Sequence, residues 1–295
     1  MSGPPATVSE DHLHANEGTI VMVMGPTHAM SGAAVGLAVA QILPAQWGGV
    51  TTIPDALMFA GIAAGGALLP DLDSPQATVS RSFGPLSQGL SRVVENASQT
   101  FVNLTRSRKD PYCRNGHRTA THTLWFALGT GAAAAALMSA FGKAAAVALL
   151  FVLLGLAIRG LLPEWSKKAD WLVITGVSAL VAWAAWQWAP NSGSGVVMGS
   201  AVTIGVLTHL AGDFITKRGI PLLAPLPLGR QRWRNLGTPK PLRIAAAGPT
   251  DKVLLTAFTL MVLVQLYLVI TGTTIAQQSL VPALTESKLR WWPAL

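Results

Sequence analysis

The chain has 295 residues, of which 51% are hydrophobic and 12% are charged. This charged share is about half that of ordinary soluble proteins, which excludes a disordered chain and a soluble enzyme with a charged shell. The 21 lysines and arginines outnumber the 13 acidic residues, and the net charge is +8. Long apolar segments recur along the chain, and helices are the usual way for such segments to cross a bilayer. We therefore predict an all-α membrane protein.

About seven apolar segments have the length of membrane-spanning helices. In chain order they cover residues 28–45, 54–70, 122–142, 144–162, 169–190, 195–213 and 252–273. They predict a polytopic helix bundle that is embedded in the membrane over 27–273. We expect a disordered tail at 1–26 before this domain and a short carboxyl-terminal tail at 274–295 after it.

The basic residues concentrate on one side of these spans. If the chain alternates sides, the amino tail, 71–121, 160–168 and 214–251 share one face, which with its flanking residues carries 18 of the 21 lysines and arginines. Such an excess is typical of the cytoplasmic side. We predict a multi-pass protein of the cytoplasmic membrane with its N-terminus on that side. Because this topology accounts for the net charge, we expect no nucleic-acid partner.

Two of the segments on the basic face are long. Segment 74–116 contains Leu86, Leu90, Val93 and Val94 at helical spacing, which predicts an amphipathic helix on the inner membrane surface. It is expected either to cover the functional site or to act as a lid. Segment 214–251 is predicted to be a basic cytoplasmic loop.

Ionisable residues at the ends of the spans give the strongest functional signal, because a charge near lipid is costly. They form four clusters: His28; Asp71 and Asp73; His117 and His122; His209 and Asp213. Alternating crossings bring all four clusters to the cytoplasmic side, whereas His12 and His14 lie in the tail. Imidazoles and carboxylates are ligands of zinc and similar metals. The clusters therefore predict a divalent metal site, with zinc as the favoured metal and two or more ions, in which one carboxylate is free to act as a base.

Arginines near these clusters suit an anionic substrate. Arg118 lies within the third cluster, and further arginines follow the sixth span at Arg230, Arg232 and Arg234. Guanidinium groups bind phosphate through paired hydrogen bonds, which makes Arg118 a candidate catalytic residue. The same arginines also serve topology and contact anionic headgroups. Asp251, just before the last span, is expected to cap that helix or to support the metal ligands.

These motifs resemble the YdjM-type bacterial inner-membrane proteins, which are described as membrane-bound, metal-dependent hydrolases. The resemblance rests on His28, on Leu-Pro-Asp-Leu-Asp at 69–73, on His-Arg-x-x-Thr-His at 117–122 and on His-Leu-x-x-Asp at 209–213. The motifs come in the family's order and cover most of 28–265. Their pattern is also similar to zinc-dependent phospholipase C and to fungal single-strand nucleases, helical enzymes that cleave phosphate esters with a zinc cluster.

The resemblance implies roles for the site residues. The implied metal ligands are His28, Asp71, His117, His122, His209 and Asp213. Asp73 is implied to be a further ligand or the catalytic base. The implied function is hydrolysis of a phosphoester by a metal-activated water at the cytoplasmic face. We favour a membrane lipid as the substrate, because the site would lie at headgroup depth, and leave other anionic small molecules open.

Two other classes of function stay open. A metal-ion transporter also places histidine and aspartate inside the membrane, where they line ion pathways. A transporter, however, needs polar residues that continue toward the outer side, and the middles of the predicted spans are almost uniformly apolar. A scaffold would use one metal only to lock the helices together.

Overall fold

The computed structural model of the chain describes residues 25–42, 53–168, 170–188, 195–246 and 248–271. Within these ranges the chain forms helices, and its β-contacts are isolated bridges such as that between Thr216 and Ile244. The predicted all-α fold is confirmed. The predicted tails lie outside the described residues, apart from Gly25 and Pro26.

Each apolar segment predicted from the sequence contains a helix. These helices are α1 (Gly25–Ile42), α2 (Ile53–Gly66), α4 (Leu124–Phe141), α5 (Lys143–Leu161), α7 (Trp171–Trp188), α8 (Gly195–Phe214) and α9 (Pro249–Ile270). The segments between them contribute α3 (Pro85–Thr105), α6 (Pro163–Lys168) and the 3-10 turns η3 (Pro70–Asp73), η4 (Thr78–Arg81), η5 (Ala120–His122) and η6 (Lys240–Leu242).

Five of the described helices are long and apolar enough to cross a membrane. They are α2 continued through η3, α4, α5, α8 and α9. The apolar part of α7 is shorter, over Trp171–Gln187, and α1 is not among the five. The number of seven crossings is therefore not confirmed and stays a prediction.

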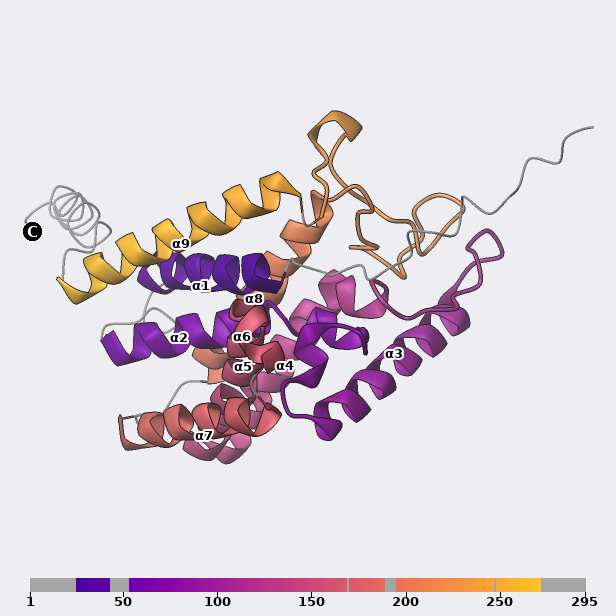
Figure 1. The fold of residues 1–295 in the computed structure, drawn as a ribbon. Helices are drawn as coiled ribbons and strands as arrows, with labels where there is room; N and C mark the ends of the chain where they lie inside the picture. The colour runs from indigo at the N-terminus through magenta and orange to yellow at the C-terminus, as the bar shows by residue number, and fades with distance from the viewer. Residues whose placement is uncertain (1–24, 43–52, 169, 189–194, 247, 272–295) are drawn as a thin grey trace, which may run out of the picture.

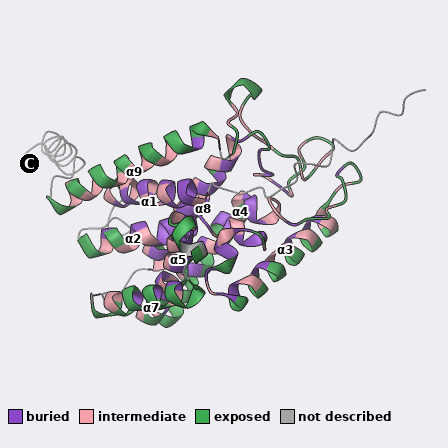
Figure 2. Cartoon of the chain, in the orientation of Figure 1, coloured by how far each residue is buried: buried purple, intermediate pink, exposed green. Residues whose placement is uncertain are grey.

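Helix α2 lies at the centre of the bundle and contacts α1, α5 and α8. Helix α9 packs on α1 and α7 packs on α5, and they lie on opposite sides of the bundle (Figure 1). The core around α2 is built from side chains such as Phe59, Ile62 and Leu156. In α9 only Asp251 is buried, and its apolar residues are exposed or half-buried along the whole helix (Figure 2). An outer surface this apolar is what a helix facing lipid requires.

Small residues allow the central helices to approach closely. A Cβ atom on Gly65 of α2 would collide with the carbonyl oxygen of Leu153 in α5, and one on Gly205 of α8 would collide with the carbonyl oxygen of Ala63 in α2. Close backbone contact of this kind is a common basis of helix association in membranes. The bundle therefore depends on glycine at these two positions.

We predict that Gly65→Ala destabilises the protein by about 1–3 kcal/mol, because the added methyl group overpacks the contact between α2 and α5. Gly129→Ala on α4 is the matched control, since a Cβ atom there has nothing within 4 Å. Thermal unfolding of both variants in the same detergent measures the difference. Equal stability of the two variants would contradict the packing described here.

Helix α3 lies outside the bundle at the end where η3 and η5 lie (Figure 1). It packs on η3, η4 and η5 and buries a face that contains Ser87, Ser91 and Ser98. Away from this buried face it exposes apolar side chains such as Leu86 and Leu90. The predicted amphipathic helix is therefore present and covers the turns that carry the polar clusters. Its location on the membrane surface stays a prediction.

The end of α3 is tied to the loop after α8 by the buried carboxylate of Asp110. Its Oδ2 accepts the backbone N–H groups of Ser107 at 2.8 Å and Arg232 at 3.1 Å, and its Oδ1 accepts that of Trp233 at 3.2 Å. Burial alone would raise the pKa of Asp110, but these three donors outweigh it and hold the pKa below its ordinary value. The ionised carboxylate thus joins two segments that are far apart in the sequence.

We predict that Asp110→Asn weakens this junction by about 1–3 kcal/mol, because neutralising the carboxylate weakens three hydrogen bonds. Hydrogen exchange over 105–112 and 228–236 at pH 7 measures the loss. Glu95→Gln on α3 is the control, since it removes the same charge from a carboxylate outside the junction.

The effect of pH gives a second check on this junction. The folded pKa of Asp110 lies below the unfolded value of about 3.9, so the stabilisation is complete above that value and disappears as the pH falls through the folded pKa. Wild type and Asp110→Asn should then converge in acid, and a difference that persists there would contradict this account.

Candidate metal centre

Four separate parts of the chain bring buried imidazoles and carboxylates to one place. The first turn of α1, the turn η3, the turn η5 and the last turns of α8 carry His28, Asp71, Asp73, His122, His209 and Asp213. All of these except Asp71 have at most 3% of their surface exposed. Because burying an ionisable group without a partner is costly, these side chains pair with one another, and together they form a group that could hold a metal ion.

Three atoms at the centre have the spacing of metal ligands. The Nε2 atoms of His122 and His209 are 3.1 Å apart, and they lie 3.3 Å and 3.6 Å from Oδ2 of Asp213. Tetrahedral ligands with bonds of about 2.0–2.1 Å to zinc are about 3.3 Å from one another. Among the described residues, this buried Oδ2 atom has no hydrogen-bond partner. These donors therefore fit a divalent metal ion.

The backbone of the turn directly after α2 sets the orientation of His209. Its Nδ1 lies 2.7 Å from the carbonyl oxygen of Ala67, to which only a protonated nitrogen can donate. Nδ1 therefore carries the proton, and the lone pair of Nε2 faces His122 and Asp213. A hydrogen bond of this kind on the far nitrogen is usual for histidines that bind metals.

Two overlapping groups of side chains are able to hold an ion. One consists of His28, His209 and Asp213, and the other of Asp71, His122 and His209, with the ligand atoms of each group within 4.8 Å of one another. The ring of His28 stacks on that of His209 with the centroids 4.0 Å apart, and its Nε2 lies 3.6 Å from Oδ1 of Asp213. The structure thus offers buried His/Asp groups for a metal, whereas the kind and number of ions stay predictions.

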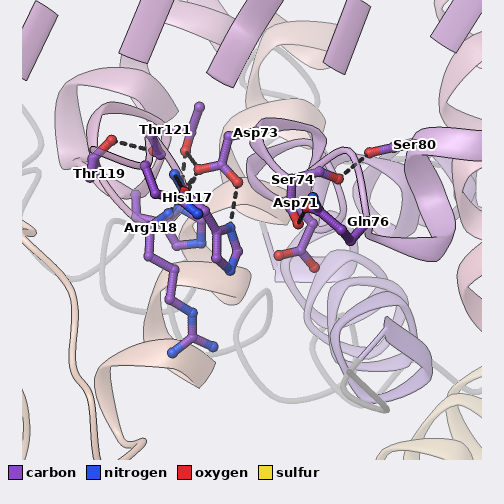
Figure 3. A network of polar contacts seen from close by, with 12 residues as sticks. Asp71, Asp73, Ser74, Gln76, Ser80, His117, Arg118, Thr119 and Thr121 are labelled. Atoms are coloured by element: carbon purple, nitrogen blue, oxygen red, sulfur yellow. Dashed lines mark hydrogen bonds and ion pairs between the residues drawn. The ribbon is translucent and has the colours of Figure 1, made fainter. Parts of the chain in front are cut away.

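Asp73 is fully buried, and Figure 3 shows its side chain in contact with His117. Its Oδ1 lies 2.7 Å from Nδ1 of His117, and its Oδ2 accepts the backbone N–H of Arg118 and the hydroxyl of Thr121. Nδ1 of His122 is 3.4 Å from the same Oδ2. In this position the carboxylate orients two imidazoles. The predicted roles of Asp73 as base and of His117 as ligand are not tested by these contacts, and His117 lies outside both metal-binding groups.

Arg118 places its positive charge against the centre. Its Nη2 lies 2.7 Å from Oδ1 of Asp213, and its Nη1 donates to the hydroxyl of Thr216 at 3.4 Å. Its backbone has a φ of +56°, a conformation that is uncommon outside glycine and is often found at functional sites. The other arginines considered for an anionic substrate behave differently, since Arg230, Arg232 and Arg234 are exposed on the loop beside the end of α3.

Asp251 lies in the first turn of α9, for which Gly248 is the N-cap. Its backbone oxygen accepts a hydrogen bond from Thr27, the neighbour of His28, at 3.5 Å. The side chain is buried, and its Oδ1 has no hydrogen-bond partner among the described residues. A carboxylate here complements the positive end of the helix dipole.

Some residues of the site could not be recognised as functional from the sequence. The carbonyl oxygen of Ala67 belongs to an ordinary alanine and acts only because α8 lies beside α2. Thr121 and Thr216 are common residue types whose hydroxyl groups meet the site residues Asp73 and Arg118. Thr121 lies inside the motif at 117–122, and this is the only indication that the sequence contains.

Comparison with known proteins identifies the family. The model of one family, described as YdjM inner membrane protein, matches residues 22–162 and 171–277. The chain belongs to the YdjM inner membrane protein family. The resemblance inferred from the motifs is thus confirmed, and this YdjM family member is a membrane protein with several apolar helices.

No curated protein matches the chain. No solved structure matches it either, and the similarity to phospholipase C and single-strand nucleases stays unconfirmed.

We predict that the purified protein binds at least one divalent ion and that His209→Ala and Asp213→Ala each reduce the bound metal at least tenfold. The reason is that each change removes a donor from the centre. Mass spectrometry of the metal content measures this, with His14→Ala in the amino-terminal tail as the control. Wild type with no more zinc, manganese or iron than His209→Ala would exclude the metal centre.

Proposed function

We propose that this YdjM protein is a metal-dependent hydrolase that cleaves a phosphoester, with a membrane lipid as the favoured substrate. The proposal depends most on the Nε2 atoms of His122 and His209, which converge at metal-ligand spacing with Oδ2 of Asp213, an atom without a hydrogen-bond partner among the described residues. A divalent ion held by such residues stabilises charge on a phosphoryl group and makes water a better nucleophile near neutral pH.

We further propose a multi-pass topology with the centre on the cytoplasmic side. The polar clusters, α3 and the loop after α8 lie at one end of the bundle (Figure 1), and most of the basic residues belong to these segments. A basic end is typical of the cytoplasmic side. Lys143 begins α5 and lies over the ring of Trp186, near the end of α7, at 4.8 Å. Tryptophan is enriched at both membrane interfaces, so this contact suits the interface at the other end of the bundle.

Some side chains around the centre position the imidazoles, and others are accessible to a substrate. Asp73 orients His117 and His122, and Ala67 orients His209, so the imidazoles are held before any substrate arrives. Asp71, His117 and Arg118 retain 15%, 13% and 10% of their side-chain surface, whereas Asp73 and Asp213 retain none. We propose that water and the polar headgroup of the substrate reach the centre at this edge. The guanidinium of Arg118 has N–H groups to spare for a phosphate oxygen after its contacts with Asp213 and Thr216.

Helix α8 favours hydrolysis over metal transport. A transporter needs polar groups that continue through the membrane from the metal site. In α8 the hydroxyl groups of Ser200, Thr203 and Thr208 each donate to a carbonyl oxygen of the same helix, at 2.7–2.8 Å. Apart from Thr203 and Thr208, the side chains between Ser200 and His209 are apolar or absent, so this stretch of α8 carries no line of carboxylates or imidazoles for an ion.

A panel of phosphoesters tests the reaction. We expect the metal-loaded protein in phospholipid vesicles to hydrolyse a phospholipid faster than a water-soluble phosphate ester or single-stranded DNA. Arg118→Lys should lower kcat/KM by about 10²–10³, since a positioned donor to the phosphoryl group is lost. Arg234→Lys is the matched control, because Arg234 is exposed on the loop after α8. Metal content is measured on every variant.

The same panel separates hydrolysis from the scaffold function. A fully metal-loaded wild type that cleaves no compound of the panel, with a His209→Ala variant that no longer folds, would favour the scaffold. Equal activity of Arg118→Lys and Arg234→Lys would remove Arg118 from the reaction.

A further inference from the structure

A groove of about 500 Å³ runs between α1, α8 and α9, and it reaches the metal centre at one end. Most of its wall is apolar and includes Val35, Val39, Ile204, Leu207, Leu254 and Phe258. Its polar lining includes Thr27, His28 and Ser31, which lie in the first two turns of α1. The groove therefore has a polar end at the centre and an apolar body.

The pattern of residues along the helices creates this division. His28, Ser31, Val35 and Val39 follow one another at three or four residues and so form a single stripe on α1. Gly212 of α8 packs closely against the buried ring of His28, since a Cβ atom there would lie 3.0 Å from Cε1 of His28. His28 is thus shared between the groove and the metal-binding group with His209 and Asp213.

The length of the groove suits one leaflet of a bilayer. From Thr27 to Val39 the helix advances about 18 Å. The hydrocarbon part of one leaflet is about 15 Å thick, half of a core of about 30 Å. An acyl chain that enters from the polar end would therefore follow the stripe on α1 for its whole length.

A second apolar groove provides a comparison within the same molecule. It has about 550 Å³ and lies between α4, α5 and α8, with Leu137, Ala148 and Val152 in its wall. Among the residues that the structure describes, Thr130 is the one polar residue in its lining, which contains no histidine and no charged residue. Volume and apolarity alone thus do not distinguish the two grooves, whereas the polar end of the first one does.

We infer that the groove between α1, α8 and α9 binds one acyl chain of a membrane phospholipid, whose phosphate lies at the His28 end. The inference rests on the proposed function and names the element that recognises the substrate. Charge at this end suits an anionic headgroup, since Lys217 and Lys252 are both exposed there. Lys217 bonds through its N–H to the carbonyl oxygen of Ile244, which lines the groove, and Lys252 lies two residues before Leu254. The apolar outer face of α9 places the groove beside lipid.

Photo-crosslinking of the full chain in nanodiscs tests this inference. The nanodiscs contain phosphatidylethanolamine and phosphatidylglycerol, with a trace of phosphatidylglycerol that carries a diazirine in the middle of one acyl chain. We expect mass spectrometry to find at least fivefold more label on the α1 and α8 residues of the first groove than on the α4 and α5 residues of the second.

Tryptophan substitutions give the matched comparison. Val35→Trp fills the first groove and should lower its labelling at least fivefold, whereas Val152→Trp in the second groove should leave that labelling unchanged. Leu207→Trp, on the opposite wall, gives the same test if Val35→Trp fails to fold. Val35→Trp and Leu207→Trp should also raise KM for a long-chain lipid, without changing the cleavage of a water-soluble phosphate ester.

The outcomes separate this inference from the proposed function. Specific labelling of the first groove without any hydrolysis by wild type would support the lipid site and overturn the proposed reaction. Equal labelling of the two grooves, or labelling unaffected by both Val35→Trp and Leu207→Trp, would overturn the lipid site even if hydrolysis is intact. His209→Ala should keep the label and lose the hydrolysis, because it removes a metal ligand and leaves the apolar wall in place.

Discussion

The structure depends on the need to compensate ionisable side chains that are buried at the ends of apolar helices. His122, His209 and Asp213 have no measurable exposure, and the pairing of His209 with Asp213 within α8 leaves both side chains needing partners from other segments. They are satisfied by one another, by a backbone carbonyl and by Arg118. This mutual compensation requires the ends of α1, α2, α4 and α8 to meet, which determines how the chain turns at η3 and η5. A divalent ion is the natural addition to a set of donors whose lone pairs converge.

Small residues make this convergence possible. Gly205 allows α8 to approach the backbone of α2 at Ala63, and one helical turn farther along each helix His209 meets the carbonyl oxygen of Ala67. The packing of two apolar helices and the orientation of a metal ligand are therefore consequences of one contact. A larger residue at the crossing would separate the helices and move Nε2 of His209 away from its partners.

The centre lies between two different environments. On one side, Asp71, His117 and Arg118 form a polar edge that α3 and its turns partly cover. On the other side, His28 opens on an apolar groove that continues along α1. An amphiphile has the same division between a charged head and an apolar chain, which is the reason that a phospholipid is the substrate class favoured here. A free inorganic ion, in contrast, has no apolar part that would bind to the apolar wall.

The sequence by itself determined the helices, because apolar length and periodicity specify them, and every predicted span contains one. It also indicated that the four polar clusters share one side, since a chain that alternates across a membrane has only two sides. Only the tertiary structure decided that His122, His209 and Asp213 form the central triangle, that Asp73 pairs with His122, and that Arg232 belongs to the junction with α3. These features depend on which helices are neighbours and on the rotation of each about its axis. Periodicity specifies which residues share a face, but it does not specify what that face meets.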